Sequence, residues 1–288
     1  MSRYWKGTTI AALIFCLSGI ANAQSPPSGQ GSQSQPAPQA SDKSKTTEVT
    51  PLTLDAAPAP VSADEEAAYK AFHEVSIADS KKKTEVGEAF LQKYPQSRYR
   101  SPVYTALTVG YLQLGQVPKM LEYGEKELAL SPNDVTTLAI LGQTLPRTLH
   151  GNPPDAPQVL SKAEKYSKQA IEIAPTLPKP ADLTDAQFEQ AKNQSLAMAH
   201  SGLGLVFVRR GKFAEAIPEL EQAVKIDPTP DPVNYYLLGL AHKSASHFDD
   251  AATAFNHCAT MPGSMQTTCK SGAEEAKKLG STQLSVPK

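Results

Sequence analysis

The residues of this chain that could carry chemistry are above all six histidines and three cysteines. The histidines form no HExxH motif, the spacing that places two metal-binding imidazoles on one face of a helix. His242 and His247 stand five residues apart across an expected turn, a spacing that is weak for zinc, so we predict no metal site. No serine lies in a GxSxG elbow, and the Gly202-Leu203-Gly204 triplet lies inside an expected helix, where it serves packing and not phosphate binding. The sequence predicts no catalytic residues, no cofactor and no enzyme activity.

The first residues decide the compartment in which the cysteines would lie. Residues 1–23 have the pattern of a secretory signal: Arg3 and Lys6 come first, residues 10–20 form an apolar run of 11, and an Ala-Asn-Ala site ends it. The run is too short to remain as a membrane span. An uncleaved anchor and a lipid attachment at Cys16 are the alternatives. We expect a periplasmic or secreted protein with no membrane span after cleavage.

The charge balance and the next segment limit the class of partner. Without the signal, the chain contains 26 basic and 29 acidic residues. This balance argues against nucleic acid as a partner, because binding it requires a basic surface. Residues 24–61 are rich in Ser, Gln, Pro and Ala and contain no aromatic residue, so we expect a disordered linker. It acts either as a spacer or as a peptide for an envelope partner. Residues 281–288 are expected to form a disordered tail.

From residue 62 onward the pattern becomes helical, and we find no convincing strand. Ser62 with Glu65, and Thr184 with Gln187, are capping boxes that satisfy orphan amides at a helix start. Pro232 follows a capping aspartate at the first position of another helix. Proline and glycine fall between the expected helices, where turns belong. One of these helices is long and covers about 184–210.

Residues 202–228 and 237–263 read almost alike at a spacing of 35 residues. In a 34-residue frame that starts at Ala197, small and large residues alternate at fixed places: Leu203, Gly204, Phe207, Gly211, Ala216, Leu220, Ala223 and Pro228. This pattern closely resembles the tetratricopeptide repeat, a helical hairpin whose small residues let its two helices cross closely. One hairpin cannot bury its apolar face alone, so such repeats stack.

The resemblance implies an all-α, right-handed solenoid of helix-turn-helix repeats over 62–280, closed by a C-terminal capping helix. The copy at 101–134 is degenerate because Met120 and Glu127 stand at its small places. The end of the first hairpin, "FLQKYPQSRY", is similar to first repeats of bacterial envelope proteins of this superfamily. The expected hairpins are about 62–95, 101–134, 135–177 with an insertion at 146–157, 184–230 and 232–263, followed by the cap at 264–279.

In this superfamily the first helices of the hairpins line a concave groove that binds another protein. The lysine and asparagine with which some members clamp acidic chaperone tails are missing at the matching places, so we predict no such ligand. The groove looks apolar with a few cations and suits an extended or helical peptide of some acidic character. Leu205 and Leu240 could instead be partly core. The predicted groove residues are Thr105, Val109, Gln113, Gln143, Arg147, Ser201, Leu205, Arg209, Tyr236, Leu240 and Lys243.

Cys258 and Cys269 lie equally far from the centre of the turn between the last hairpin and the cap. In an antiparallel pair of helices this places them at one level, and in an oxidising compartment it predicts a disulfide. Two buried free thiols are the alternative. The sequence therefore predicts a non-enzymatic protein–protein interaction scaffold in the bacterial envelope. An envelope assembly or cell-wall factor that regulates a bound enzyme is the alternative function.

Overall fold

The computed structural model describes residues 62–181 and 183–284, and the predicted signal peptide and linker lie outside this part. Within it the chain forms eleven α-helices and one 3-10 turn, η1 (Ala174–Thr176), and no strand. Residues 281–284 belong to the last helix, which corrects the predicted start of a tail at 281. The helices are α1 (Ala63–Glu74), α2 (Ser80–Lys93), α3 (Arg100–Gln113), α4 (Val117–Leu130), α5 (Val135–Thr148), α6 (Ala156–Ile173), α7 (Asp185–Arg209), α8 (Phe213–Ile226), α9 (Pro232–Ser244), α10 (Phe248–Thr260) and α11 (Gln266–Leu284).

The helices begin where the sequence places capping side chains. The Ser62 hydroxyl accepts a hydrogen bond from the amide of Glu65 (3.2 Å). At the start of α7 the capping box is complete, because the Gln187 amide donates to the Thr184 hydroxyl (3.3 Å) and the Thr184 amide donates to the Gln187 side chain (3.0 Å). Asp231 accepts from the amide of Val233 (3.0 Å) at the start of α9. These bonds satisfy amides that a helix end otherwise leaves without a partner.

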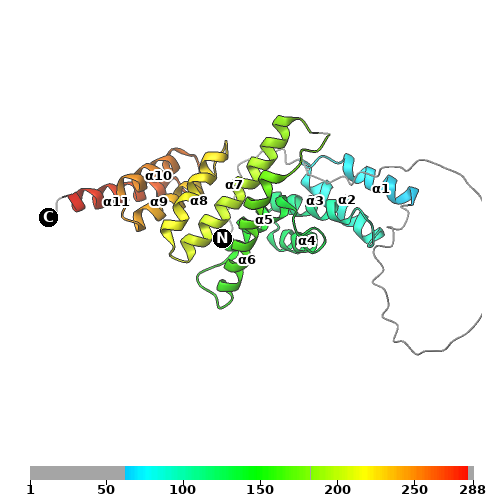
Figure 1. Ribbon diagram of the computed structural model, residues 1–288, viewed down its shortest axis with the longest axis horizontal. Coiled ribbons are helices and arrows are strands. Elements are labelled where there is room, and N and C mark those ends of the chain that lie inside the picture. The colour runs from blue at the N-terminus through cyan, green and yellow to red at the C-terminus, as the bar shows by residue number, and fades with distance from the viewer. Residues whose placement is uncertain (1–61, 182, 285–288) are drawn as a thin grey trace, which may run out of the picture.

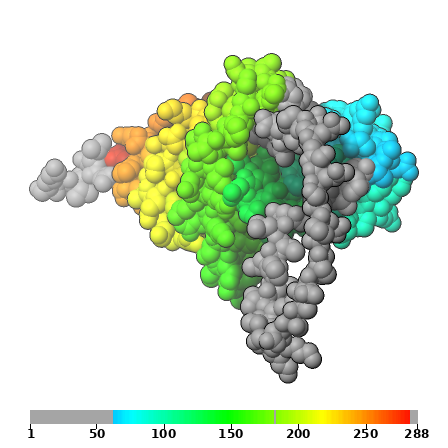
Figure 2. Space-filling view, turned by 45° about the vertical axis from the view of Figure 1, so that its right-hand side comes forward, coloured from blue at the N-terminus to red at the C-terminus, as the bar shows by residue number. Residues whose placement is uncertain are grey.

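Consecutive helices form antiparallel hairpins that follow one another along the molecule (Figure 1). The pairs are α1/α2, α3/α4, α5/α6, α7/α8 and α9/α10, and α11 covers α10 at the end of the stack. In the space-filling view the colours succeed one another in bands, as expected when each hairpin contacts mainly its neighbours in sequence (Figure 2). The fold is therefore the all-α solenoid that the sequence predicts.

Small residues allow the two helices of a hairpin to cross closely. A Cβ atom added at Gly204 would lie 2.6 Å from Cγ of Leu220, and one at Gly239 would lie 2.7 Å from the Phe255 ring. Ala216 is also fully buried at this crossing. Leucine and phenylalanine on the second helix thus fill the space that glycine leaves on the first, as the repeat pattern predicts.

Two helices depart from an even repeat. The first is α5, which continues through a buried Pro146 to Thr148, so the predicted insertion at 146–157 shrinks to a loop over 149–155. The second is α7, which has 25 residues and is about 37 Å long at 1.5 Å per residue. Its N-terminal part projects from the stack (lime in Figures 1 and 2). Among all these described helices, none is long and apolar enough to cross a membrane.

Candidate functional site

The first helices of successive hairpins form one continuous row, because α3 contacts α5, α5 contacts α7 and α7 contacts α9. Four of the predicted groove residues on this row are enclosed between helices: Thr105 (5% exposed), Val109 (0%), Ser201 (1%) and Leu205 (8%). A partner cannot reach these side chains in this structure. We therefore correct the predicted groove by removing them, and for Leu205 the core interpretation applies.

The three predicted groove cations already have partners within the chain. Arg147 on α5 forms an ion pair with Asp231 at 3.1 Å and also donates to Ser201 at 3.3 Å. Arg209 on α7 donates to the carbonyl oxygen of Leu149 at 2.8 Å and so ties down the loop after α5. Lys243 is paired with an acidic residue of α11, as described below. Two of the three cations are thus paired with acids, whereas Arg209 is bound only to a carbonyl oxygen.

A hydrogen-bonded chain of polar groups joins three successive first helices. Arg147 of α5 donates to the buried hydroxyl of Ser201 on α7, and that hydroxyl donates to Asn234 of α9 at 2.6 Å. Asn234 is 3% exposed, so its side-chain oxygen needs such a partner. These contacts fix the positions of α5, α7 and α9 relative to one another. The row of first helices is therefore held rigid at this point.

The remaining predicted residues lie at or near the surface of the row. Gln143 is half-buried on α5, and Gln113 is exposed at the end of α3, where it accepts a hydrogen bond from Ser80. Tyr236 and Leu240 are half-buried on α9 and pack against the core beneath α10 and α11. Lys243, one turn further along α9, binds Glu275 of the cap at 2.8 Å. Tyr236 and Leu240 are thus partly accessible to a partner and also pack against the core.

Two hollows open on the other side of the stack, between second helices. The first is about 260 Å³ and lies between α4 and α6, where Glu125, Lys165 and Tyr166 line it. The second is about 200 Å³ and lies between α8 and α10, with α9 as its floor, and its lining includes Glu221 and His257. None of the predicted groove residues lines either hollow, since that prediction considered only the first helix of each hairpin.

A carboxylate outside the predicted groove, that of Glu88, joins α2, α3 and α4. One oxygen of Glu88 accepts from the hydroxyls of Tyr111 (2.5 Å) and Tyr123 (3.1 Å) and from the ammonium of Lys119 (2.8 Å). Partial burial would raise the pKa of Glu88, but the hydrogen bonds from Lys119 and the two tyrosines outweigh it and lower that pKa. A carboxylate this well satisfied stabilises the hairpin contact and is poorly suited to take up a proton.

Glu127 on α4 is a buried acid at a place where other copies of the repeat carry a small residue. It is 1% exposed, and one of its oxygens accepts from the Ser101 hydroxyl at 2.6 Å. The other oxygen has no hydrogen-bond partner among the described residues. Burial raises the pKa of Glu127 to about 7, while the bond from Ser101 acts in the opposite direction. The residue is thus close to half protonated at neutral pH.

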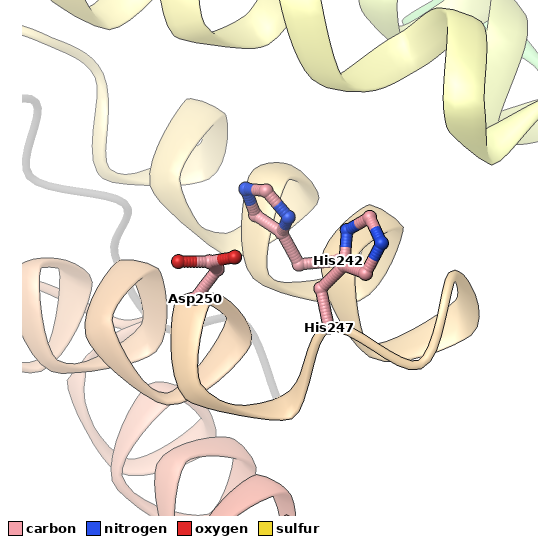
Figure 3. Close-up of side chains that lie close together, drawn as sticks. All are labelled: His242, His247 and Asp250. Carbon is pink, nitrogen blue, oxygen red and sulfur yellow. The ribbon is translucent and has the colours of Figure 1, made fainter.

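The turn between α9 and α10 brings two histidines and an aspartate together (Figure 3). A ring nitrogen of His242, a ring nitrogen of His247 and a carboxylate oxygen of Asp250 lie within 4.8 Å of one another. His242 is buried, and the other two side chains are exposed. Burial lowers the pKa of His242. The spacing of the two histidines alone is weak for a metal site, and Asp250, three residues after His247, adds a third group that could bind an ion.

The two cysteines of the last hairpin and the cap lie against each other. Cys258 on α10 and Cys269 on α11 are both 0% exposed, their sulfur atoms are in contact, and their Cα atoms are 5.8 Å apart. That Cα separation falls within the range that a disulfide spans. The prediction that they lie at one level of an antiparallel pair is confirmed.

Solved structures that align with the chain include repeat proteins of low sequence identity. TTC0263, a thermophilic TPR protein of Thermus thermophilus, is 18% identical, with a TM-score of 0.45 over 74% of this chain and 99% of its own. MamA AMB-1 is 16% identical, with a TM-score of 0.45 over 67% and 94%. A tetratricopeptide repeat protein of Parabacteroides merdae is 14% identical, with a TM-score of 0.28 over 74% and 96%. No curated protein matches the chain.

Stacked antiparallel hairpins with a capping helix define this chain as an α-solenoid repeat protein. Residues 197–230 match the family model described as Tetratricopeptide repeat. They comprise the C-terminal part of α7, all of α8 and the turn that follows. This segment is therefore a repeat of the tetratricopeptide-repeat superfamily, and the neighbouring hairpins stack on it in the same architecture. Proteins of this superfamily are generally non-enzymatic scaffolds that bind other proteins, and this is the function that the fold suggests.

Proposed function

We propose that this protein is an exported, non-enzymatic scaffold that binds a peptide segment of another protein on the row of first helices α3, α5, α7 and α9. The observation that carries the proposal is the continuity of this row, in which each first helix contacts the next. An extended or helical peptide can follow such a row and contact one or two side chains from each hairpin. Stacked repeats create extended binding surfaces in this way.

The side chains available on the row are polar with apolar neighbours. Gln143 on α5, Val208 on α7 and Leu240 on α9 are half-buried, while Arg147 and Arg209 are exposed. The ion pair between Arg147 and its aspartate is about one-third exposed on both sides (34% and 36%). An ion pair of this kind contributes less than about 1 kcal/mol, so an acidic group of the partner can replace the aspartate at little cost. This supports a peptide with some acidic character.

The cysteine pair supports the exported part of the proposal. A bond between Cys258 and Cys269 requires an oxidising compartment, such as the periplasm or the extracellular medium. The contact of their buried sulfur atoms and the signal pattern at residues 1–23 point to the same location by independent routes. Protein recovered from the envelope fraction should begin at Gln24 and be lighter by two hydrogen atoms than its reduced form. A chain that keeps residues 1–23 or carries two free thiols would contradict this part.

The test of the binding face is site-specific photo-crosslinking in intact cells. We expect a photo-reactive residue at Gln143 to capture one partner protein, whereas the same residue at Gln222 captures none. Gln222 is exposed on α8, a second helix outside the row. The captured partner is then purified, and its affinity for the full chain is measured by calorimetry.

Introducing a negative charge provides the quantitative arm of this test. Gln143→Glu places a carboxylate one helical turn from Arg147, which neutralises that cation and repels an acidic peptide. An added like charge at about 4 Å costs about 1 kcal/mol in bulk water and more near a protein surface. A loss of about 1–2 kcal/mol is therefore expected, which lowers affinity about 5- to 30-fold. Gln222→Glu adds the same charge on the opposite side and should leave affinity unchanged. Equal losses in both variants would place the interface elsewhere.

A further inference from the structure

The cluster at the α9–α10 turn has the composition of a metal site, and it stands independently of the proposed binding face. His242 comes from the last turn of α9, His247 precedes α10 directly, and Asp250 lies in the first turn of α10 (Figure 3). The backbone amide of His247 donates to the carbonyl oxygen of His242 at 2.9 Å, which closes the turn and holds both imidazoles at one level. Nitrogen and carboxylate ligands in this combination suit a zinc ion.

The repeat itself does not require these three residues. The preceding hairpin has the same turn 35 residues earlier, where Phe207 stands in place of His242. Lys212 stands there in place of the second histidine and Glu215 in place of the aspartate, and these two form an ordinary ion pair at 3.6 Å. The same turn therefore folds with an aromatic residue and a surface ion pair. Helix packing alone does not explain two histidines at these places.

His242 also has an unsatisfied nitrogen. Its Nδ1 atom is buried and has no hydrogen-bond partner among the residues described. A buried polar atom without a partner is unfavourable, and a ligand in contact with it would remove that penalty. Its other ring nitrogen, Nε2, lies 3.8 Å from a carboxylate oxygen of Glu221 on α8.

The hollow between α8 and α10 gives access to the cluster. His242, Asp250 and Glu221 all contribute to the lining of this space of about 200 Å³. An ion held by three protein ligands keeps one position open to water or to another carboxylate. A water molecule or a side chain of a bound protein can occupy that position from the hollow.

We propose that His242, His247 and Asp250 bind one zinc ion, with the remaining coordination position directed into the hollow beside Glu221. The ligand atoms lie within 4.8 Å of one another, so small side-chain rotations bring them around a single ion. The exposed His247 and Asp250 are free to make these rotations, since they lie at the surface of the turn. The ion would link the C-terminal end of α9 to the start of α10 and so fix the geometry of the last hairpin.

Calorimetric titration of the full chain with zinc chloride tests the proposal. We expect one zinc ion per chain with a dissociation constant in the micromolar range or below. His242→Phe and His247→Lys restore the residues of the preceding hairpin, so both variants should fold, and melting followed by circular dichroism verifies this. Each should weaken zinc binding by about 100-fold or more, which exceeds the 10- to 100-fold typical of residues that only orient a metal ligand.

His73→Gln is the matched control, because it removes an exposed histidine of α1 at the other end of the stack. Its zinc affinity should equal that of the unaltered chain. Zinc should also shift the imidazole NMR signals of His242 and His247 while leaving those of His73 in place. Absence of binding below 1 mM, equal binding by His247→Lys, or an equal loss in His73→Gln would each overturn the site.

Discussion

Replacing Gly202 by alanine tests how closely α5 and α7 approach each other. A Cβ atom built at Gly202 would lie 2.5 Å from the carbonyl oxygen of Gly142 and 2.8 Å from Cα of Gln143. Both are backbone atoms of α5, so no side-chain rotation can relieve the contact. By contrast, a Cβ atom at Gly204 meets the side chain of Leu220, which has some freedom to move. The two glycines of the triplet therefore serve different contacts.

The structure sets the size of the effect. A carbon–oxygen contact relaxes to about 3.3 Å, so α5 and α7 must separate by about 0.8 Å around the new methyl group. A gap of that size forfeits a quarter to a half of the dispersion energy of the atoms along it. Overpacking of this kind costs about 1–3 kcal/mol, and the rigid backbone places Gly202→Ala at the upper end. The better helix propensity of alanine returns up to about 1 kcal/mol, which leaves a net loss near 2 kcal/mol.

Urea unfolding followed by circular dichroism measures this loss. Gly280→Ala in α11 is the control, because its added Cβ atom would meet nothing closer than 3.4 Å. That variant should gain about 0.5–1 kcal/mol from helix propensity alone. In a domain of this size we expect Gly202→Ala to melt about 4–8 °C lower and Gly280→Ala about 1–4 °C higher. A Gly202→Ala protein as stable as the unaltered chain would refute the rigid contact between the helices.

Three further predictions concern stability. Burial raises the pKa of Glu127 to about 7 in the folded chain, whereas its value in the unfolded chain is near 4.5. Between these pH values the folded state binds more protons than the unfolded state. The free energy of unfolding therefore falls as pH rises from about 4.5 to 7. Glu127→Gln should abolish this fall and add about 1–3 kcal/mol at pH 8, and an unchanged pH slope in urea unfolding would contradict the assignment. Replacing both Cys258 and Cys269 by alanine should cost about 3 kcal/mol if a bond closes their 11-residue separation, and no loss would favour two free thiols. Ser246 has a positive φ of 64° where the preceding hairpin has Gly211, so Ser246→Gly should raise the unfolding free energy by about 1 kcal/mol, and a lower melting temperature would argue against that strain.

The helices and their pairing could be predicted from the sequence because both depend on local, repeated signals. The capping groups Ser62, Thr184 and Asp231 act within three residues of themselves. Thr184 forms the complete predicted box and Asp231 caps its helix, whereas Ser62 accepts from the Glu65 amide without the return bond from the Glu65 side chain. The small residues Gly204 and Gly239 recur at a fixed spacing, and both meet a large side chain of the paired helix. The end of α5 does not follow this repeat, and there the predicted helix boundary was wrong. Pro146 lies inside the helix and not in an inserted loop.

The candidate binding face could be predicted only in outline. The repeat indicates which helices form the row, but the exposure of a side chain depends on the neighbouring hairpin. Thr105 and Ser201 are thus buried although they stand at groove places of the repeat. Arg147 and its partner Asp231 are 84 residues apart, and no local pattern relates them.

The sequence by itself determined the class of fold, the helix starts and the level of the cysteine pair, because each depends on residues close together or at a constant repeat. Only the tertiary structure decided that Gly202 lies against the backbone of α5 and that the groove cations Arg147 and Lys243 pair with acids far away in the sequence. These features depend on the angle and distance between helices, which are set by the packing of many side chains at once and leave no spacing to find in the sequence.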